Sequence, residues 1–240
     1  MRIDKYLADA GLGTRSEVKK MIRNRMVSVD ENVVMDCAYQ VALHNHITVN
    51  GQAVSCEEFV YYMLHKPAGV VSATRDTKEK TVVDLITEHR RRDLFPVGRL
   101  DKDTEGLLLI TNDGKLGHNL LHPRKHVDKT YYAKIKGCVT KEHVEAFAEV
   151  FSIGDEKDTE PARLEILKSG DESEIEITIT EGRYHQIKRM FEAHDRKVLY
   201  LKRLRMGTLQ LDETLAPGQY RRLTAQELKE LEEEYGTTKE

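Results

Sequence analysis

A short apolar run, Leu107 to Ile110, lies between two turn-forming segments, and it constrains the fold more than any other stretch. Because the run is short and ends at Asp113-Gly114, a strong turn signal, it predicts a buried β-strand. The segment before it, residues 98–106, is acidic and turn-forming. Asp101 is therefore expected in a loop beside a rigid sheet, where reactive side chains are commonly held. Aspartate before a strand is also ordinary turn chemistry, so this pattern alone assigns no function.

Composition narrows the class of protein without identifying a partner. The 240 residues, 39% of them hydrophobic, suffice for one substantial core or two small domains. Charged residues make up 33%, yet the formal net charge is only -3, so charge must be interpreted locally. Three widely spaced cysteines argue against a disulfide framework or a zinc site and are expected to be buried. No stretch is apolar enough to span a membrane, and no signal peptide begins the chain, so we expect a cytoplasmic protein.

The N-terminal region predicts a small helix-and-hairpin unit. Thr14 and Glu17 have the spacing of a capping box, which predicts a second helix to about Arg25. Asn50-Gly51 between short alternating segments predicts a β-hairpin. Residues 1–25 hold seven basic and three acidic side chains, and such a basic helix is either a solvated face or a nucleic-acid contact. The polar stretch 55–58 is interpreted as a linker, which gives domains of 1–55 and 56–240.

The larger region predicts strands and a second basic stretch. Residues 173–180 alternate strictly between polar and apolar, which is typical of an antiparallel strand with one buried face. Residues 59–64 and 129–135 are also strand-like. Residues 181–206 hold eight basic and three acidic side chains, so the near-neutral total conceals a basic stretch in each domain. His118, His122 and His126 are spaced by four, but Pro123 interrupts the predicted helix, so we expect no metal site there.

Three segments carry a family resemblance. Residues 98–114, GRLDKDTEGLLLITNDG, and residues 181–190, EGRYHQIKRM, resemble motifs of bacterial ribosomal pseudouridine synthases of the RsuA type. The N-terminal helices and turn resemble a small RNA-binding module first named for ribosomal small-subunit protein four. The resemblance implies an α+β protein with that module followed by a larger catalytic domain, a mixed, mainly antiparallel sheet flanked by helices. It assigns Asp101 as the catalytic residue, Lys188 as its basic partner and Tyr131 to the uridine pocket.

The implied activity is isomerisation of a uridine to pseudouridine in 16S ribosomal RNA, at position 516 in the usual numbering. It requires neither metal nor cofactor, and the partner would be 16S RNA or a partly assembled small subunit, met by a monomer. Residues 156–158 and 184–186 favour the small-subunit enzyme. Side chains expected to contact RNA are Arg99, Arg15, Lys19, Lys20, Arg23, Arg183 and Arg189.

Physical chemistry adds one geometric expectation. Burial beside an apolar strand would disfavour an ionised Asp101, and a nearby ammonium would reverse this, so we predict a close ion pair with Lys188. Three alternatives stay open at this stage. They are a synthase acting on large-subunit ribosomal RNA, a noncatalytic RNA-binding assembly factor, and a glycoside hydrolase using Asp101 and Asp103. Residues two apart point to opposite sides of an extended segment, which disfavours the hydrolase.

Overall fold

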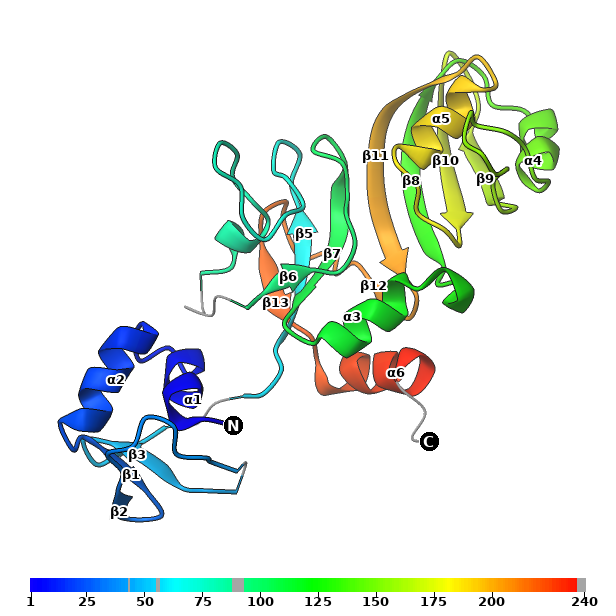
Figure 1. The fold of residues 1–240 in the computed structure, drawn as a ribbon. Coiled ribbons are helices and arrows are strands. Elements are labelled where there is room, and N and C mark those ends of the chain that lie inside the picture. Colours follow the sequence, from blue (N-terminus) through cyan, green and yellow to red (C-terminus); the bar gives the residue numbers. More distant parts are fainter. Residues whose placement is uncertain (43, 55–56, 88–92, 237–240) are drawn as a thin grey trace. The chain divides into compact units, whose positions relative to one another are not determined.

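The computed structural model describes residues 1–42, 44–54, 57–87 and 93–236, which fall into two compact units (Figure 1). The first unit comprises residues 1–60 and 86–94, and the second comprises residues 61–85 and 95–240. The expected domain boundary between residues 55 and 56 lies outside the described residues.

The first unit packs two helices against a small antiparallel sheet with the strand order β2-β1-β3-β4. The predicted capping box is present, since the Glu17 backbone N–H donates to Thr14 Oγ1 and the Thr14 N–H donates to the Glu17 carboxylate. Asn50 and Gly51 both have positive φ and join β3 to β4, which confirms the predicted hairpin. The elements are α1 (Ile3–Asp9), α2 (Arg15–Arg23), β1 (Val27–Val29), β2 (Asn32–Val33), β3 (Ile47–Val49) and β4 (Gln52–Ala53).

The second unit is built on a mixed sheet that, within the described residues, has nine strands. Its main order is β13-β5-β7-β11-β8-β10-β9, with β6 paired to β7 and β12 paired to β11. Only the β7–β11 pair among these is parallel, so the predicted mixed, mainly antiparallel sheet is confirmed. The strands are β5 (Tyr61–Lys66), β6 (Phe95–Pro96), β7 (Glu105–Thr111), β8 (Lys129–Lys136), β9 (Arg163–Lys168), β10 (Glu172–Ile179), β11 (Lys197–Met206), β12 (Leu209–Gln210) and β13 (Tyr220–Arg222).

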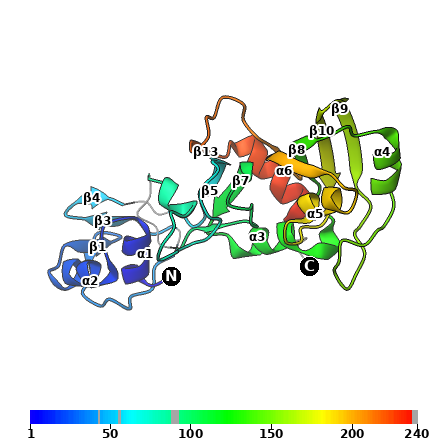
Figure 2. The ribbon, with the colours of Figure 1, turned by 90° about the horizontal axis from the view of Figure 1, so that it is seen from above.

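Helices cover this sheet in two groups. The first group, α3 and α6, packs side by side, and its apolar side chains share a core with β7, as Leu116, Leu231 and Leu107 illustrate. In the second group, α5 packs on β11 and α4 on the edge strand β9 (Figure 2). The helices are α3 (Gly114–Leu121), α4 (Lys141–Phe147), α5 (Gln186–Glu192) and α6 (Ala225–Tyr235), and the 3₁₀ turns are η1 (Val83–Leu85) and η2 (Pro123–Lys125).

The β7–β11 pairing depends on one glycine. Gly106 has a φ of +105°, and a Cβ at this position would lie 2.2 Å from the carbonyl oxygen of Arg203 and 2.6 Å from its backbone nitrogen. The two backbones therefore approach more closely than any side-chain-bearing residue allows. This contact fixes the loop before β7 against the middle of β11.

Several local predictions need correction. The strand expected over 59–64 begins at Tyr61 and continues to Lys66. Lys66, the last residue of this strand, is fully buried. Cys138, expected to be buried, is exposed. The basic stretch 181–206 is not a uniform charged surface, because it contains β11 and because Arg203 is only 2% exposed.

Candidate active site

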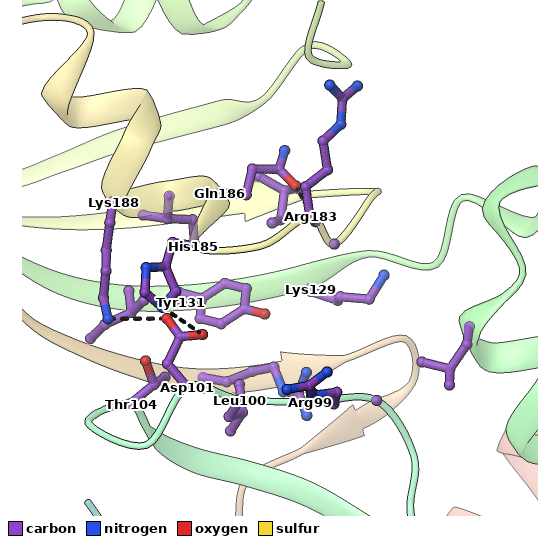
Figure 3. A pocket seen from close by; sticks show the side chains of 17 residues that line it. Arg99, Leu100, Asp101, Thr104, Lys129, Tyr131, Arg183, His185, Gln186 and Lys188 are labelled. Carbon is purple, nitrogen blue, oxygen red and sulfur yellow. Dashed lines mark hydrogen bonds and ion pairs between the residues drawn. The ribbon is translucent and has the colours of Figure 1, made fainter. Parts of the chain in front are cut away.

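A pocket of about 120 Å³ opens in the second unit where several segments of sequence meet (Figure 3). The loop of residues 98–104 forms one wall, β8 and β11 form the floor, and the segment 182–188 forms the opposite wall. Asp101, Tyr131 and Lys188, the three side chains assigned to catalysis from the sequence, all line it. The loop leads directly into the buried strand β7, as the apolar run predicts.

The predicted ion pair is present, and it includes a second carboxylate. Lys188 Nζ lies 3.0 Å from Asp101 Oδ2 and 2.7 Å from Asp103 Oδ1. Asp101 and Lys188 are 26% and 19% exposed, so the pair is half-buried rather than fully buried. The expectation that Asp101 and Asp103 diverge was wrong, because residues 101–104 form a turn, closed by a hydrogen bond from the Thr104 N–H to the Asp101 carbonyl.

The contact between Lys188 and Asp103 shifts the pKa of Asp103 downward and that of Lys188 upward. The hydrogen bond from Lys188 is the largest cause that lowers the pKa of Asp103 below its ordinary value. Desolvation alone would lower the pKa of Lys188, but its bonds to Asp103 and Asp101 raise the pKa above the ordinary value. Lys188 thus remains an ammonium throughout the physiological range, in contact with the carboxyl groups of Asp101 and Asp103.

His185 is a second partner of Asp101, and no pattern in the sequence singles it out for this contact. Its Nε2 lies 3.6 Å from Asp101 Oδ1. His185 takes a left-handed conformation, with a φ of +50°, at the residue before α5, and this turn aims the imidazole back at the loop. Its other face stacks on the ring of Tyr184, with centroids 3.9 Å apart.

Lys66 supports the Asp101 loop from beneath. Its Nζ donates to the carbonyl oxygens of Thr104 at 2.8 Å, Pro67 at 3.0 Å and Lys102 at 3.3 Å. Desolvation lowers the pKa of Lys66 to about 8, although the charges of Asp103 and Asp101 oppose this shift. A buried ammonium with three carbonyl partners is well satisfied, so the loop cannot move without breaking several strong bonds.

The end of the pocket away from Lys188 is basic and aromatic. Tyr131 and Lys129 project from β8, and in Figure 3 the Tyr131 ring lies between Asp101 and Lys129. Lys129 donates to the Val127 and Thr180 carbonyl oxygens, and desolvation lowers its pKa to about 8. Arg99 lines the same end and is exposed. An aromatic ring flanked by cations suits a planar, electron-rich ligand such as a nucleobase.

The other side chains expected to contact RNA fall into two groups. On α2, Arg15, Lys20 and Arg23 are exposed, and Lys19 is partly exposed. In the second unit, Arg189 binds Asp155 at 2.6 Å. Arg183 binds Glu181 at 2.9 Å and also donates to two loop carbonyl oxygens. These two arginines hold the loop around Asp155 in place, and their contact with RNA stays a prediction.

Two further observations concern what the described residues contain. Within them, no three His, Cys, Asp or Glu side chains gather as a metal would require, although the rings of His118 and His122 lie 5.3 Å apart. None of the described helices is long and apolar enough to cross a membrane.

Comparison with known families identifies the chain. Residues 60–193, which include the whole Asp101 loop and Lys188, match the model of the RNA pseudouridylate synthase family. The chain belongs to this family. Residues 1–43 match the S4 domain, in agreement with the RNA-binding module expected at the N-terminus. The protein is therefore a pseudouridine synthase, an isomerase, with an S4 domain preceding its catalytic domain.

Relatives of this synthase cover nearly its whole length. An uncharacterised RNA pseudouridine synthase of Bacillus subtilis is 47% identical over 97% of this chain and 99% of its own. Ribosomal large subunit pseudouridine synthase B of Bacillus subtilis is 40% identical over 96% of this chain and 95% of its own. Ribosomal small subunit pseudouridine synthase A of Vibrio cholerae is 39% identical over 95% and 98%. A crystal structure of a pseudouridylate synthase matches with a TM-score of 0.68 and 36% identity, covering 96% of this chain and 99% of that one.

Proposed function

We propose that this synthase converts one uridine of small-subunit ribosomal RNA to pseudouridine, at position 516 in the usual numbering. The main support for this proposal is the Asp101 carboxylate, which pairs with Lys188 at 3.0 Å in a pocket lined by Tyr131. The reaction breaks the C1′–N1 bond and joins C1′ to C5, and C5 then loses its proton while N1 gains one. It is an isomerisation, so electrons balance without an oxidant or reductant.

Asp101 acts on the substrate as a nucleophile or base, and Lys188 keeps its carboxylate ionised and oriented. Tyr131 stacks on the uracil after it leaves the RNA stack, a step that costs a few kcal/mol by rough estimate. Stacking on a tyrosine returns about 1–3 kcal/mol of that cost. Arg99, exposed at the rim of the pocket, occupies or braces the space from which the base departs.

The choice of RNA rests on relatives and on local sequence. Synthases named for the small subunit, such as that of Vibrio cholerae, match over nearly their full length, and so does one named for the large subunit. Residues 156–158 and 184–186 favour the small-subunit assignment. The S4 domain supplies affinity for 16S RNA or a partly assembled subunit through phosphate contacts of α2, and this substrate would place a monomeric enzyme in the cytoplasm.

Mapping pseudouridines tests the proposal directly. Ribosomal RNA from cells lacking this protein is expected to lose one small-subunit pseudouridine, which returns with the wild-type gene and stays absent with Asp101→Asn. Loss of a large-subunit position instead would reassign the substrate. An unchanged map would refute the proposed RNA, and restoration by Asp101→Asn would remove Asp101 from the mechanism. Normal subunit maturation with the Asp101→Asn protein would point to an added assembly role.

A further inference from the structure

Two buried polar atoms at the pocket have no hydrogen-bond partner among the described residues. They are Nη2 of Arg203 and Oγ1 of Thr104, on side chains whose residues are each 2% exposed. Proteins rarely leave such atoms unsatisfied, because an unpaired buried donor forfeits its bonds to water. Both residues line the pocket that holds Asp101 and Tyr131. Their unpaired atoms therefore lie in the wall of the space that a substrate would fill.

The Arg203 guanidinium is fixed in place. Its Nε donates to the Leu107 carbonyl oxygen at 2.8 Å, and its backbone is pressed against Gly106. The hydrogen bond from Nε therefore holds the side chain, and Nη2 remains available as a donor. A donor that is positioned before the ligand arrives loses little conformational entropy when it binds.

The neighbourhood of Arg203 favours an oxygen that carries negative charge. Lys129 lines the same pocket and is 8% exposed, and its pKa is lowered first by desolvation and next by the charge of Arg203. Two buried cations that repel each other gain when an electron-rich oxygen lies between or beside them. Asp101 is not that partner in this structure, because Arg203 Nη2 has no hydrogen-bond partner among the described residues, whereas Asp101 contacts Lys188 and His185.

We propose that Arg203 donates through Nη2 to a carbonyl oxygen of the bound uracil, with the Thr104 hydroxyl as a second polar contact. This inference rests on the proposed function, since it concerns the uridine of that reaction. The burial of both residues favours the base over a backbone phosphate, because the phosphates of an RNA strand must continue along the protein surface. Tyr131 would stack on the face of the same ring.

The contact would serve both specificity and rate. Cytosine presents an amino group where uracil presents its second carbonyl, so a fixed cationic donor favours uracil. As the C1′–N1 bond breaks, its electron pair stays with the base and negative charge builds on the carbonyl oxygens. A pre-positioned guanidinium stabilises that charge more than it stabilises the neutral base, which is the condition for acceleration.

Single-turnover rates on RNA with uridine, 2-thiouridine or 4-thiouridine at the target position test the proposal. Sulfur accepts hydrogen bonds weakly, so we expect one of the two thio substitutions to slow the wild-type enzyme about tenfold or more. Arg203→Gln should slow the reaction on uridine about ten- to a hundredfold. In this variant, the thio base that slows the wild-type enzyme should change the rate by less than twofold. Arg205→Gln is the matched control, since Arg205 on the same strand also donates Nε to a carbonyl oxygen but lies outside the pocket. It should behave as wild type.

Thr104→Val provides a second test in case the Arg203→Gln protein does not fold. It removes an unpaired hydroxyl without changing side-chain shape, so its denaturation midpoint should equal or exceed that of wild type while its rate falls. An Arg203→Gln enzyme as sensitive to thio substitution as wild type would overturn the inference. If Arg203→Gln does not fold, a wild-type rate for Thr104→Val overturns it. Wild-type protein that forms no pseudouridine in ribosomal RNA would instead refute the proposed function itself.

Discussion

Gly106→Ala should destabilise the catalytic domain strongly, because the new methyl group would collide with a backbone that cannot step aside. Its carbon would lie 2.2 Å, 2.6 Å and 2.9 Å from the carbonyl oxygen, nitrogen and carbonyl carbon of Arg203. Strands β7 and β11 would have to separate by about 0.8 Å to bring the closest contact to 3.0 Å. Overpacking of this kind costs about 1–3 kcal/mol. The left-handed φ of +105° adds about 1–3 kcal/mol for a residue with a side chain.

The expected total, about 2–6 kcal/mol, is a large part of the 5–15 kcal/mol that stabilises a typical domain. Urea denaturation followed by circular dichroism measures it as a lower midpoint at an unchanged slope. Gly114→Ala is the control, since a Cβ there meets nothing within 4 Å and alanine favours the helix that begins at this residue. Equal midpoints for Gly106→Ala and wild type would refute the close approach of β7 and β11.

Three further results are expected. Lys188→Met should abolish pseudouridine formation and cost about 1–3 kcal/mol of stability, between the values for exposed and buried ion pairs. Lys102→Met, which breaks the exposed pair with Glu79, is the control and should cost less than about 1 kcal/mol. Equal losses of stability in the two variants would contradict the geometry of the site. Lys66 and Lys129 each have a pKa of about 8 in the folded protein against an ordinary 10.5, so the unfolded chain holds more protons between these values and the free energy of unfolding should rise with pH there. Denaturation at pH 7.5 and pH 9.5 should show a smaller rise for Lys129→Met than for wild type, and an identical rise would show that Lys129 is not desolvated. Replacing Arg15, Lys20 and Arg23 by Gln should weaken RNA binding and reduce the slope of log K against log salt by about 2, measured by titration at several salt concentrations, and an unchanged slope would place the RNA elsewhere.

Much of the fold was predictable because its signals are local. The alternation of residues 173–180 predicted β10, which spans Glu172–Ile179, since one face of that strand is buried and the other is polar. The capping box at Thr14 and the turn at Asn50 follow from hydrogen bonds and dihedral angles within four residues. Asp101 and Lys188 came from motif resemblance, which also implied that they are neighbours, and electrostatics gave the reason for an ion pair between them.

The features that escaped prediction depend on contacts between distant segments. Nothing near Lys66 in sequence indicates that its ammonium binds carbonyl oxygens 36 and 38 residues away. Arg203 stands in a run of basic residues that suggests an exposed face, yet its side chain is buried and donates to the Leu107 carbonyl oxygen. Likewise, Asp103 reaches Lys188 because residues 101–104 turn, whereas an extended segment would have turned it away.

The parallel pairing of Lys202 with Glu105 and of Arg203 with Gly106 bears on how the chain matures during translation. The strand that follows the aspartate's loop leaves the ribosome almost a hundred residues before its partner, and such distant pairings are slow to form. A nascent chain arrested before β11 would carry the sequence of the S4 domain but no finished pocket. Chemistry would begin only when the last third of the polypeptide has docked, so catalysis reports completion of the whole catalytic domain.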